Sequence, residues 1–401
     1  MIIVRTEHDF QDIDILLFFD SKIGKLYVKK YKDGLKTLSE VKKEINNFLG
    51  ENGLEHLDFK LICNSPVENA YSAPIKLFLD ITDECNLECK HCLNTRLNSK
   101  HYLSLDVIKQ IANECEKLGI FYVKLGGGEP LLHPNFSEII KILREKNIFI
   151  SLSTNGYFID ESIAKLLYEN QVKVTVSIEG PERIDAEIRG KDHFDVAVNA
   201  LRILKRNKVN VSFRVTLTKY LLNTELIENL RQLAMKEQVK VKFAYCKPSG
   251  LALDNQMIIG MEDKKEYYEI INILNEPNNL KYFIIENGMM KNQDKYYEDF
   301  YYRGKGCGAG SRTMHIDALG IISACVFIRK WYDSITSYLD TSIETFWKAE
   351  DNKSSDLLKM IRNISFPEEC KECQRNCNGQ CMALRLYNTG SLLGYNVNCL
   401  K

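Results

Sequence analysis

The chain has 401 residues, of which 45% are hydrophobic and 27% charged, so it is long enough for two or three domains with cores of their own. Lysine plus arginine and aspartate plus glutamate both number 54, and this balance argues against nucleic acid or an acidic membrane as a partner. The sequence has no run of eighteen apolar residues and no signal-peptide pattern, which predicts a cytoplasmic protein. Thirteen cysteines in such a chain favour metal or cluster binding over disulfides.

Residues 1–72 are expected to form a small α+β unit. The apolar runs 15–19 and 25–29 are spaced to pair as a hairpin, and a helix at 38–49 and a strand at 57–62 are expected to follow.

Residues 73–245 alternate short β-branched runs with amphipathic stretches. Strands are expected at 76–81, 121–125, 148–153, 172–178, 209–216 and 239–245, and helices near 104–118, 136–146, 160–169, 193–206 and 223–236. Such regular alternation predicts a parallel sheet, and six units make an incomplete (β/α)6 barrel. In such barrels the chemistry lies at the carboxyl ends of the strands.

A cysteine motif follows the first of these strands. Cys85, Cys89 and Cys92 have the spacing Cys-x3-Cys-x2-Cys, which suits three corners of a [4Fe–4S] cluster and leaves the fourth iron without a protein ligand. Taken alone, the three cysteines also suit part of a zinc site.

A glycine motif, Gly126-Gly127-Gly128-Glu129-Pro130, follows the second strand. In this order and at this distance, the two motifs resemble those of the radical S-adenosylmethionine (SAM) superfamily. The resemblance implies that the open iron binds SAM and passes it one electron, which gives a 5′-deoxyadenosyl radical. It also implies that Gly127 and Gly128 let the backbone approach the methionine end of SAM, and that the Glu129 carboxylate receives its amino group.

The resemblance carries further SAM contacts onto this sequence. His91, directly before the third cysteine, is expected at the adenine, and a solvent-edge role is its alternative. The other expected contacts lie at strand ends or just beyond them, and any of them could instead support the loops: Asn155, Ser177, Glu179, Arg189 and Thr216. Arg214 and Thr216 face the barrel mouth if Val215 points outward.

Residues 246–305 are rich in Tyr, Asn, Lys and Glu and are expected to form a connecting segment with some helix. Residues 306–401 hold a second set of cysteines, which resembles the SPASM domain, a cluster-binding extension of radical SAM enzymes. The resemblance implies a first auxiliary [4Fe–4S] cluster on Cys307, Cys325 and Cys381. It implies a second on Cys370, Cys373, Cys377 and Cys399, with Cys377 two residues closer to Cys373 than in the family pattern. Zinc knots are the alternative to these auxiliary clusters.

The expected cofactors are therefore three [4Fe–4S] clusters and SAM, with a low-potential electron donor of the flavodoxin or ferredoxin type. The two-part layout resembles that of maturases that form thioether or carbon–carbon crosslinks in ribosomally made peptides. Residues 1–72 would then bind the leader of a precursor peptide by strand addition, with a barrel cap or a dimer contact as the alternative.

Three other functions stay open. One is modification of a small molecule or cofactor, such as a tetrapyrrole. Another is sulfatase maturation, which Val326 disfavours because that group typically has Asp there. The last is a non-enzymatic metal-binding module.

Overall fold

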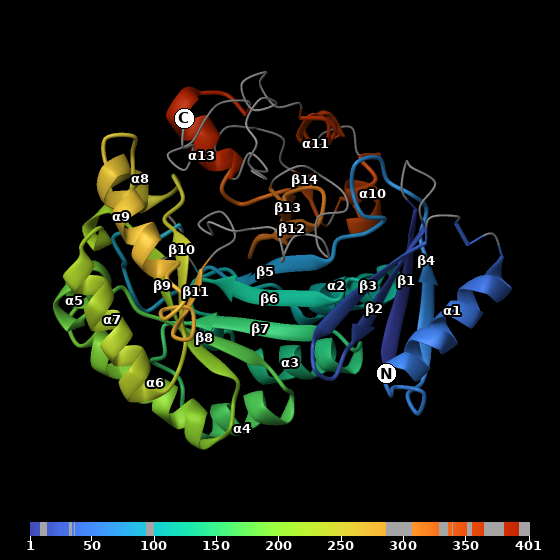
Figure 1. Cartoon of the computed structure of the whole chain (residues 1–401), viewed down its shortest axis with the longest axis horizontal. Coiled ribbons are helices and arrows are strands. Elements are labelled where there is room, and N and C mark those ends of the chain that lie inside the picture. Colours follow the sequence, from blue (N-terminus) through green and yellow to red (C-terminus); the bar gives the residue numbers. More distant parts are fainter. Residues whose placement is uncertain are drawn as a thin grey trace.

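The computed structural model describes residues 1–8, 14–31, 34–35, 37–93, 100–285, 307–328, 336–338, 340–350, 355–364 and 381–392. The described strands form a four-stranded sheet near the N-terminus and a ten-stranded sheet that runs through the rest of the molecule (Figure 1).

The middle of the large sheet is the expected partial barrel. Its strands pair in chain order, and every neighbouring pair is parallel. They are β5 (Lys76–Thr82), β6 (Tyr122–Gly127), β7 (Phe149–Thr154), β8 (Lys173–Ser177), β9 (Val211–Leu217) and β10 (Val241–Tyr245). The six predicted strands and the α/β fold class are thereby confirmed.

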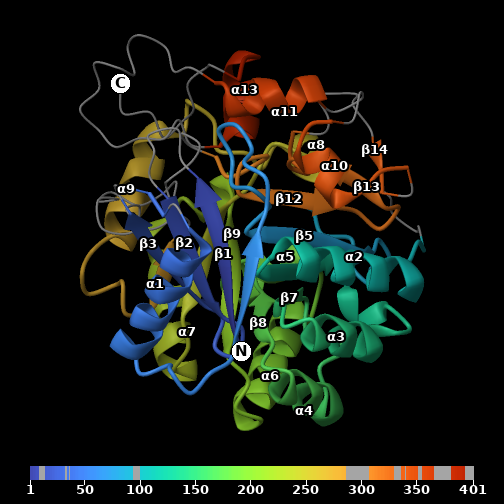
Figure 2. The same cartoon turned by 90° about the vertical axis from the view of Figure 1, so that its right-hand side faces the viewer.

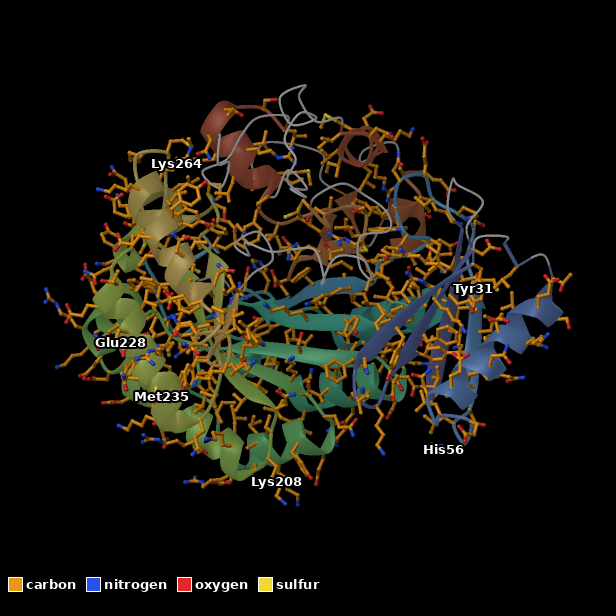
Figure 3. The ribbon with its side chains drawn as sticks, in the orientation of Figure 1. Tyr31, His56, Lys208, Glu228, Met235 and Lys264 are labelled. Carbon is orange, nitrogen blue, oxygen red and sulfur yellow. The ribbon has the colours of Figure 1, made fainter. Side chains whose placement is uncertain are left out.

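Helices cover the outer face of these strands. They are α2 (Leu105–Leu118), α3 (Phe136–Glu145), α4 (Glu161–Glu169), α6 (His193–Arg206) and α7 (Thr224–Glu237), as expected, together with α5 (Glu182–Arg189), which was not predicted. Strand residues such as Val123 and Leu125 share one buried core with helix residues such as Ile108 and Ile139. Charged side chains project outward from the helical layer, as Glu228 on α7 does (Figure 3).

Both ends of the barrel sheet are extended. β11 (Phe283–Ile285) pairs parallel with β10, and β12 (Thr313–Ile316) pairs parallel with β5. β13 (Ile321–Ser323) and β14 (Thr336–Ser337) then add in antiparallel order. A strand from the cysteine-rich C-terminal part therefore lies against the strand that leads into the first cysteine motif.

Short helices fill the remaining described segments: α8 (Leu251–Asp254), α9 (Lys264–Leu274), α10 (Ile343–Trp347), α11 (Ser355–Arg362) and α13 (Met382–Thr389). No helix in the described ranges is long and apolar enough to cross a membrane.

The N-terminal unit holds the predicted hairpin, β2 (Asp14–Asp20) with β3 (Lys25–Tyr31), and the predicted helix α1 (Leu38–Glu51). It also contains β4 (Phe59–Cys63) and an unpredicted strand, β1 (Ile2–His8). The strand order is β3-β2-β1-β4. Figure 2 shows β3, β2 and β1 of this sheet side by side.

This sheet is fixed to the barrel by buried contacts. The Arg5 guanidinium donates to the carbonyls of Pro74 at 3.1 Å and Gly119 at 2.8 Å, and it pairs with Glu7 at 2.8 Å. The rings of Phe19 and Phe121 stack with centroids 4.8 Å apart. The unit is therefore an integral part of the structure rather than a loosely tethered module.

Candidate active site

The loop after β5 carries Cys85, Cys89 and Cys92. The Cys92 amide donates to the Cys89 carbonyl at 3.0 Å, and the Lys90 amide donates to Ile188 at the end of α5 at 2.9 Å. Burial raises the pKa of the Cys85 thiol to about 11 and that of the Cys89 thiol to about 12. Iron must therefore displace protons from both sulfurs when it binds.

Three thiolates on one loop are the donor type that a [4Fe–4S] cluster takes. The described residues contain no group of three His, Cys, Asp or Glu side chains that could hold one metal ion. A [4Fe–4S] cluster takes each thiolate on a separate iron.

The glycine motif packs directly against the cysteine loop. The Gly128 amide donates to the Thr82 carbonyl at 2.8 Å, and the Glu129 amide donates to the Glu84 carbonyl at 2.7 Å. A Cβ on Gly127 would lie 2.0 Å from Thr82 O, and one on Gly128 would lie 2.0 Å from Glu84 O. The close packing of the glycine motif against the cysteine loop therefore requires glycine at both positions. The predicted approach of the backbone to SAM is a second reason for glycine there.

Glu129 is buried at the carboxyl end of β6, with 1% of its surface exposed. Its Oε1 accepts from the Thr154 hydroxyl at 2.8 Å and its Oε2 from the Asn155 amide at 2.7 Å. Burial raises its pKa to about 7, although these hydrogen bonds and Arg189 oppose the rise. The carboxyl group is thus held rigidly and is only partly ionised near neutral pH. A bound ammonium group would favour its ionised form.

Glu179 is the centre of a second buried group. It accepts from Arg189 Nε at 3.1 Å and from the Thr216 amide at 2.8 Å, and His91 Nε2 lies 2.7 Å from its Oε1. Burial would raise the pKa of Glu179, but the charges of His91 and Arg189 outweigh it and hold the pKa at about 2. Arg189 Nη1 also lies 3.6 Å from Cys89 Sγ, so this group touches the cysteine loop.

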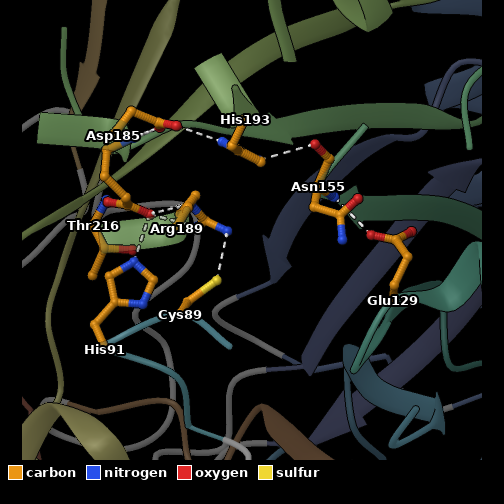
Figure 4. A network of polar contacts seen from close by, with 9 residues as sticks. Cys89, His91, Glu129, Asn155, Asp185, Arg189, His193 and Thr216 are labelled. Carbon is orange, nitrogen blue, oxygen red and sulfur yellow. Dashed lines mark hydrogen bonds and ion pairs between the residues drawn. The ribbon is translucent and has the colours of Figure 1, made fainter. Parts of the chain in front are cut away.

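A chain of polar contacts joins the two carboxylates (Figure 4). The Glu179 amide donates to Asp185 at 2.7 Å, Asp185 pairs with His193 at 2.5 Å, and His193 Nε2 lies 3.1 Å from the Asn155 carbonyl. Four predicted residues, His91, Glu179, Arg189 and Thr216, thus meet in one group, and Asn155 lies beside Glu129.

Sequence reasoning did not find Asp185 and His193. Asp185 lies on α5, and His193 is the first residue of α6. On amphipathic helices such as these, an Asp or a His looks like an ordinary surface residue. Nothing local in the sequence indicates that both side chains are fully buried.

Ser177 ends β8 and is the register partner of Arg214 on β9. Val215 belongs to the helix-facing core, whereas Arg214 and Thr216 are half-buried on the other face, so the predicted direction of β9 is confirmed. The SAM contacts of His91, Ser177, Glu179, Arg189 and Thr216 themselves stay predictions.

The segment around α8 supports the cysteine loop from the other side. The Leu251 amide donates to the Cys92 carbonyl at 2.9 Å, and the Asn255 side chain donates to the Lys90 carbonyl at 2.7 Å. A Cβ on Gly250 would lie 2.3 Å from Cys92 O. This support comes from the segment that the sequence marked only as a connection.

The structure brings Cys307, Cys325 and Cys381 together. Burial, followed by the nearby thiols of Cys307 and Cys381, raises the pKa of Cys325. All three side chains pack against the main core. The other four cysteines of the set, Cys370, Cys373, Cys377 and Cys399, lie outside the described residues.

Comparison with known proteins agrees with this geometry. Residues 79–236 match the model of the radical SAM superfamily. The chain is 26% identical over 353 residues to mycofactocin maturase MftC of Mycolicibacterium smegmatis, which covers 83% of this chain and 84% of the relative. It is 27% identical over 186 residues to GTP 3′,8-cyclase of Synechocystis, and this match covers 45% of this chain and 57% of the relative.

Among solved structures, Streptococcus suis SuiB bound to precursor peptide SuiA has the same fold. The TM-score is 0.70 at 15% identity, and the match covers 99% of this chain and 100% of that one. The matched domain contains the cysteine loop, the glycine motif and the buried Glu129 and Glu179 groups. Residues 79–236 therefore form a radical SAM domain, and such a domain indicates an enzyme that uses a [4Fe–4S] cluster and SAM.

Proposed function

We propose that this enzyme is a peptide maturase that removes hydrogen from a ribosomally made precursor peptide and forms a thioether or carbon–carbon crosslink. The observation that carries the proposal is the similarity to mycofactocin maturase MftC, which extends over 83% of the chain and therefore well beyond the barrel. The fold that the chain shares with SuiB along its whole length supports it.

Each group of residues in the site has its own proposed role. Cys85, Cys89 and Cys92 hold the cluster, which together with SAM supplies the 5′-deoxyadenosyl radical when both are bound. Glu129 accepts the amino group of SAM, because it is a rigidly held carboxylate beside the loop. Glu179 holds Arg189 in place next to Cys89 and lies 2.7 Å from His91. A flavodoxin or ferredoxin type of protein is the proposed electron donor.

The leader of the precursor is proposed to add to the N-terminal sheet. β3 is the terminal strand of this sheet, and within the described residues no strand pairs with its outer edge. An edge strand binds an extended peptide through main-chain hydrogen bonds with little demand on sequence. Hydrogen exchange tests this: the leader should protect amides of Lys25–Tyr31 and leave the opposite edge, Phe59–Cys63, unchanged. Protection at Phe59–Cys63 alone would contradict it.

Two auxiliary clusters are proposed for the C-terminal part. The proximity of Cys307, Cys325 and Cys381 supports the first of them. Three [4Fe–4S] clusters would give about 12 irons per chain. Replacing these three cysteines with alanine should remove about four irons, and a loss of zinc instead would favour the zinc alternative.

The decisive experiment is a mass spectrum. The enzyme is produced anaerobically together with a short peptide encoded beside its gene. A peptide lighter by two hydrogen atoms, formed only when Cys85, Cys89 and Cys92 are intact, is the expected result of an oxidative crosslink. An unmodified peptide from iron-loaded enzyme that still cleaves SAM would overturn the proposal.

Modification of a small molecule is the second candidate, favoured by the similarity to GTP 3′,8-cyclase. That similarity covers 45% of the chain, which is about half of what the maturase similarity covers.

A further inference from the structure

Five basic side chains lie on the inner face of the barrel sheet, opposite the helices. They are Lys76 on β5, Lys124 on β6, Lys173 on β8, Arg214 on β9 and Lys242 on β10, and they are called the basic inner face below. All five are half-buried, whereas the residues that alternate with them, such as Leu77, Val123 and Val174, are buried in the core beneath the helices.

These five charges lie close enough to affect one another. Burial, followed by the charges of Lys173, Arg214 and Lys76, lowers the pKa of Lys242 to about 7. Burial, followed by Arg214 and Lys173, lowers the pKa of Lys76 to about 8. The pKa of Lys124 is lowered well below its usual value by burial and then by the charges of Arg214, Lys76 and Lys242. The charge of Asp80 raises it and so acts in the opposite direction. The strands thus bring together cations that are widely separated in the sequence.

Within the described part of the chain, none of the five has a carboxylate in ion-pair contact. Asp80 on β5 is the carboxylate that acts on Lys124, and its Oδ2 lies 2.8 Å from His315 on β12. The ring of Phe78 lies beneath Lys76, with the ammonium 5.0 Å from the ring centroid. The face therefore groups basic side chains whose protonated forms a bound anion would favour, in a place where solvent screens charges poorly.

Two members of this face, Arg214 and Lys242, lie near the Glu179 group. Arg214 and Lys242 are register partners on adjacent strands, and Ser177 is the partner of Arg214 on its other side. Thr216, whose amide binds Glu179, is two residues further along β9, which is about 7 Å on an extended strand. An anion bound by Arg214 and Lys242 would thus lie just beneath the Glu179 group.

We propose that the basic inner face binds a carboxylate of the substrate peptide and so positions the neighbouring carbon for hydrogen abstraction. This inference rests on the proposed peptide-maturase function. The guanidinium of Arg214 can hold a carboxylate through two parallel hydrogen bonds, and the lysines add point charges around it. The carboxylate is either an acidic side chain of the modified segment or the peptide's own C-terminus.

Binding to the anaerobically reconstituted, SAM-loaded enzyme tests the proposal with defined probes. The acidic probe is acetyl-tetraglutamate amide, and its neutral control is acetyl-tetraglutamine amide. The C-terminal probe is acetyl-tetra-alanine with a free carboxylate, and its control is the same peptide as an amide. The variants are Arg214→Met and Lys242→Met, and the matched control is Lys240→Met, an exposed lysine two residues before Lys242.

At least one carboxylate probe should bind tenfold more tightly than its neutral control. Either variant should remove that preference, whereas Lys240→Met should keep it. The probe that binds identifies the source of the carboxylate. Equal binding of charged and neutral probes, or a preference that survives in both variants, would overturn the inference. Thermal unfolding and iron content verify that the variants fold and load clusters.

The outcomes for the two proposals are separable. A wild-type enzyme that prefers a carboxylate probe but modifies no precursor would refute the maturase function and leave an anion site for another substrate. A precursor that both variants modify at the wild-type rate would refute the site and leave the function standing.

Discussion

Glu129 combines a high pKa with a proposed cationic ligand, and the combination makes SAM binding depend on pH. Because burial holds its pKa at about 7, the carboxyl group is protonated in part of the molecules below neutral pH and must ionise to accept an ammonium group. We expect SAM affinity to fall as the pH decreases from 8 to 6, with proton release on binding. Calorimetry in two buffers of different ionisation enthalpy measures both quantities.

The control for this prediction is Glu129→Gln, which should bind SAM weakly and with a flat pH profile. Wild-type affinity that stays constant between pH 6 and 8 would show that Glu129 does not ionise on binding. In the SAM-free protein the same raised pKa acts on folding, because the folded state holds a proton that the unfolded state loses. Stability from this group should therefore fall as the pH rises from about 4.5 to about 7.

The charge of Glu179 contributes to stability through its buried ion pair with Arg189. Glu179→Gln would leave Arg189 buried without its carboxylate, which we expect to cost about 3–5 kcal/mol in the free energy of unfolding measured with urea. Its folded pKa of about 2 lies below the usual 4.5, so its contribution is present above pH 4.5 and is lost as the pH falls toward 2.

Glu228→Gln is the matched control, because Glu228 pairs with Arg231 at 2.6 Å on the exposed side of α7 (Figure 3). An exposed pair of this kind should cost less than about 1 kcal/mol. Equal losses in the two variants would mean that the buried position of Glu179 has no special energetic role.

At the scale of elements, the junction of β6 with the cysteine loop has no room for a side chain. Gly128→Ala would place a methyl group against the Glu84 carbonyl, so the loop must shift and the iron and sulfide content of the purified protein should drop. Gly50→Ala is the control, because nothing lies within 4 Å of the added Cβ inside α1. That variant should gain about 0.5–1 kcal/mol from helix propensity and keep its iron.

The elements also show how far sequence patterns reach. The six barrel strands are short β-branched runs between amphipathic helices, and all six were predictable because their side-chain periodicity is local. β1 was missed because Arg5 and Glu7 look like surface residues, although both are fully buried as a pair. β12 was missed because its partner, β5, is distant in the chain, and no local pattern encodes that pairing.

The residues of the site also differ in whether a local sequence pattern predicts them. The cysteine loop and Glu129 are found by motif, because their spacing is dictated by the cofactor. Asp185, His193 and the loop support from Gly250 are dictated by tertiary packing, so the sequence alone gives no sign of them.

At the scale of the whole molecule, Arg5 joins the N-terminal sheet to the barrel. Arg5→Met would leave Glu7 buried without its partner and remove the bonds to Pro74 and Gly119, at an expected cost of about 3–5 kcal/mol. Because Glu7 also accepts from Ser72, the double variant Arg5→Met with Glu7→Gln should recover part of the loss. Additive losses in the double variant would contradict a coupled pair.

The parallel pairing of β12 with β5 bears on how the protein is made. A ribosome releases β5 and the cysteine loop early, but the edge of β5 stays uncovered until Thr313–Ile316 emerges. An open strand edge is a template for association with other chains, so the nascent protein is exposed to aggregation for most of its synthesis. Slow translation before residue 313 would lengthen that exposure, and yield should then depend on codon choice in this stretch and on chaperones.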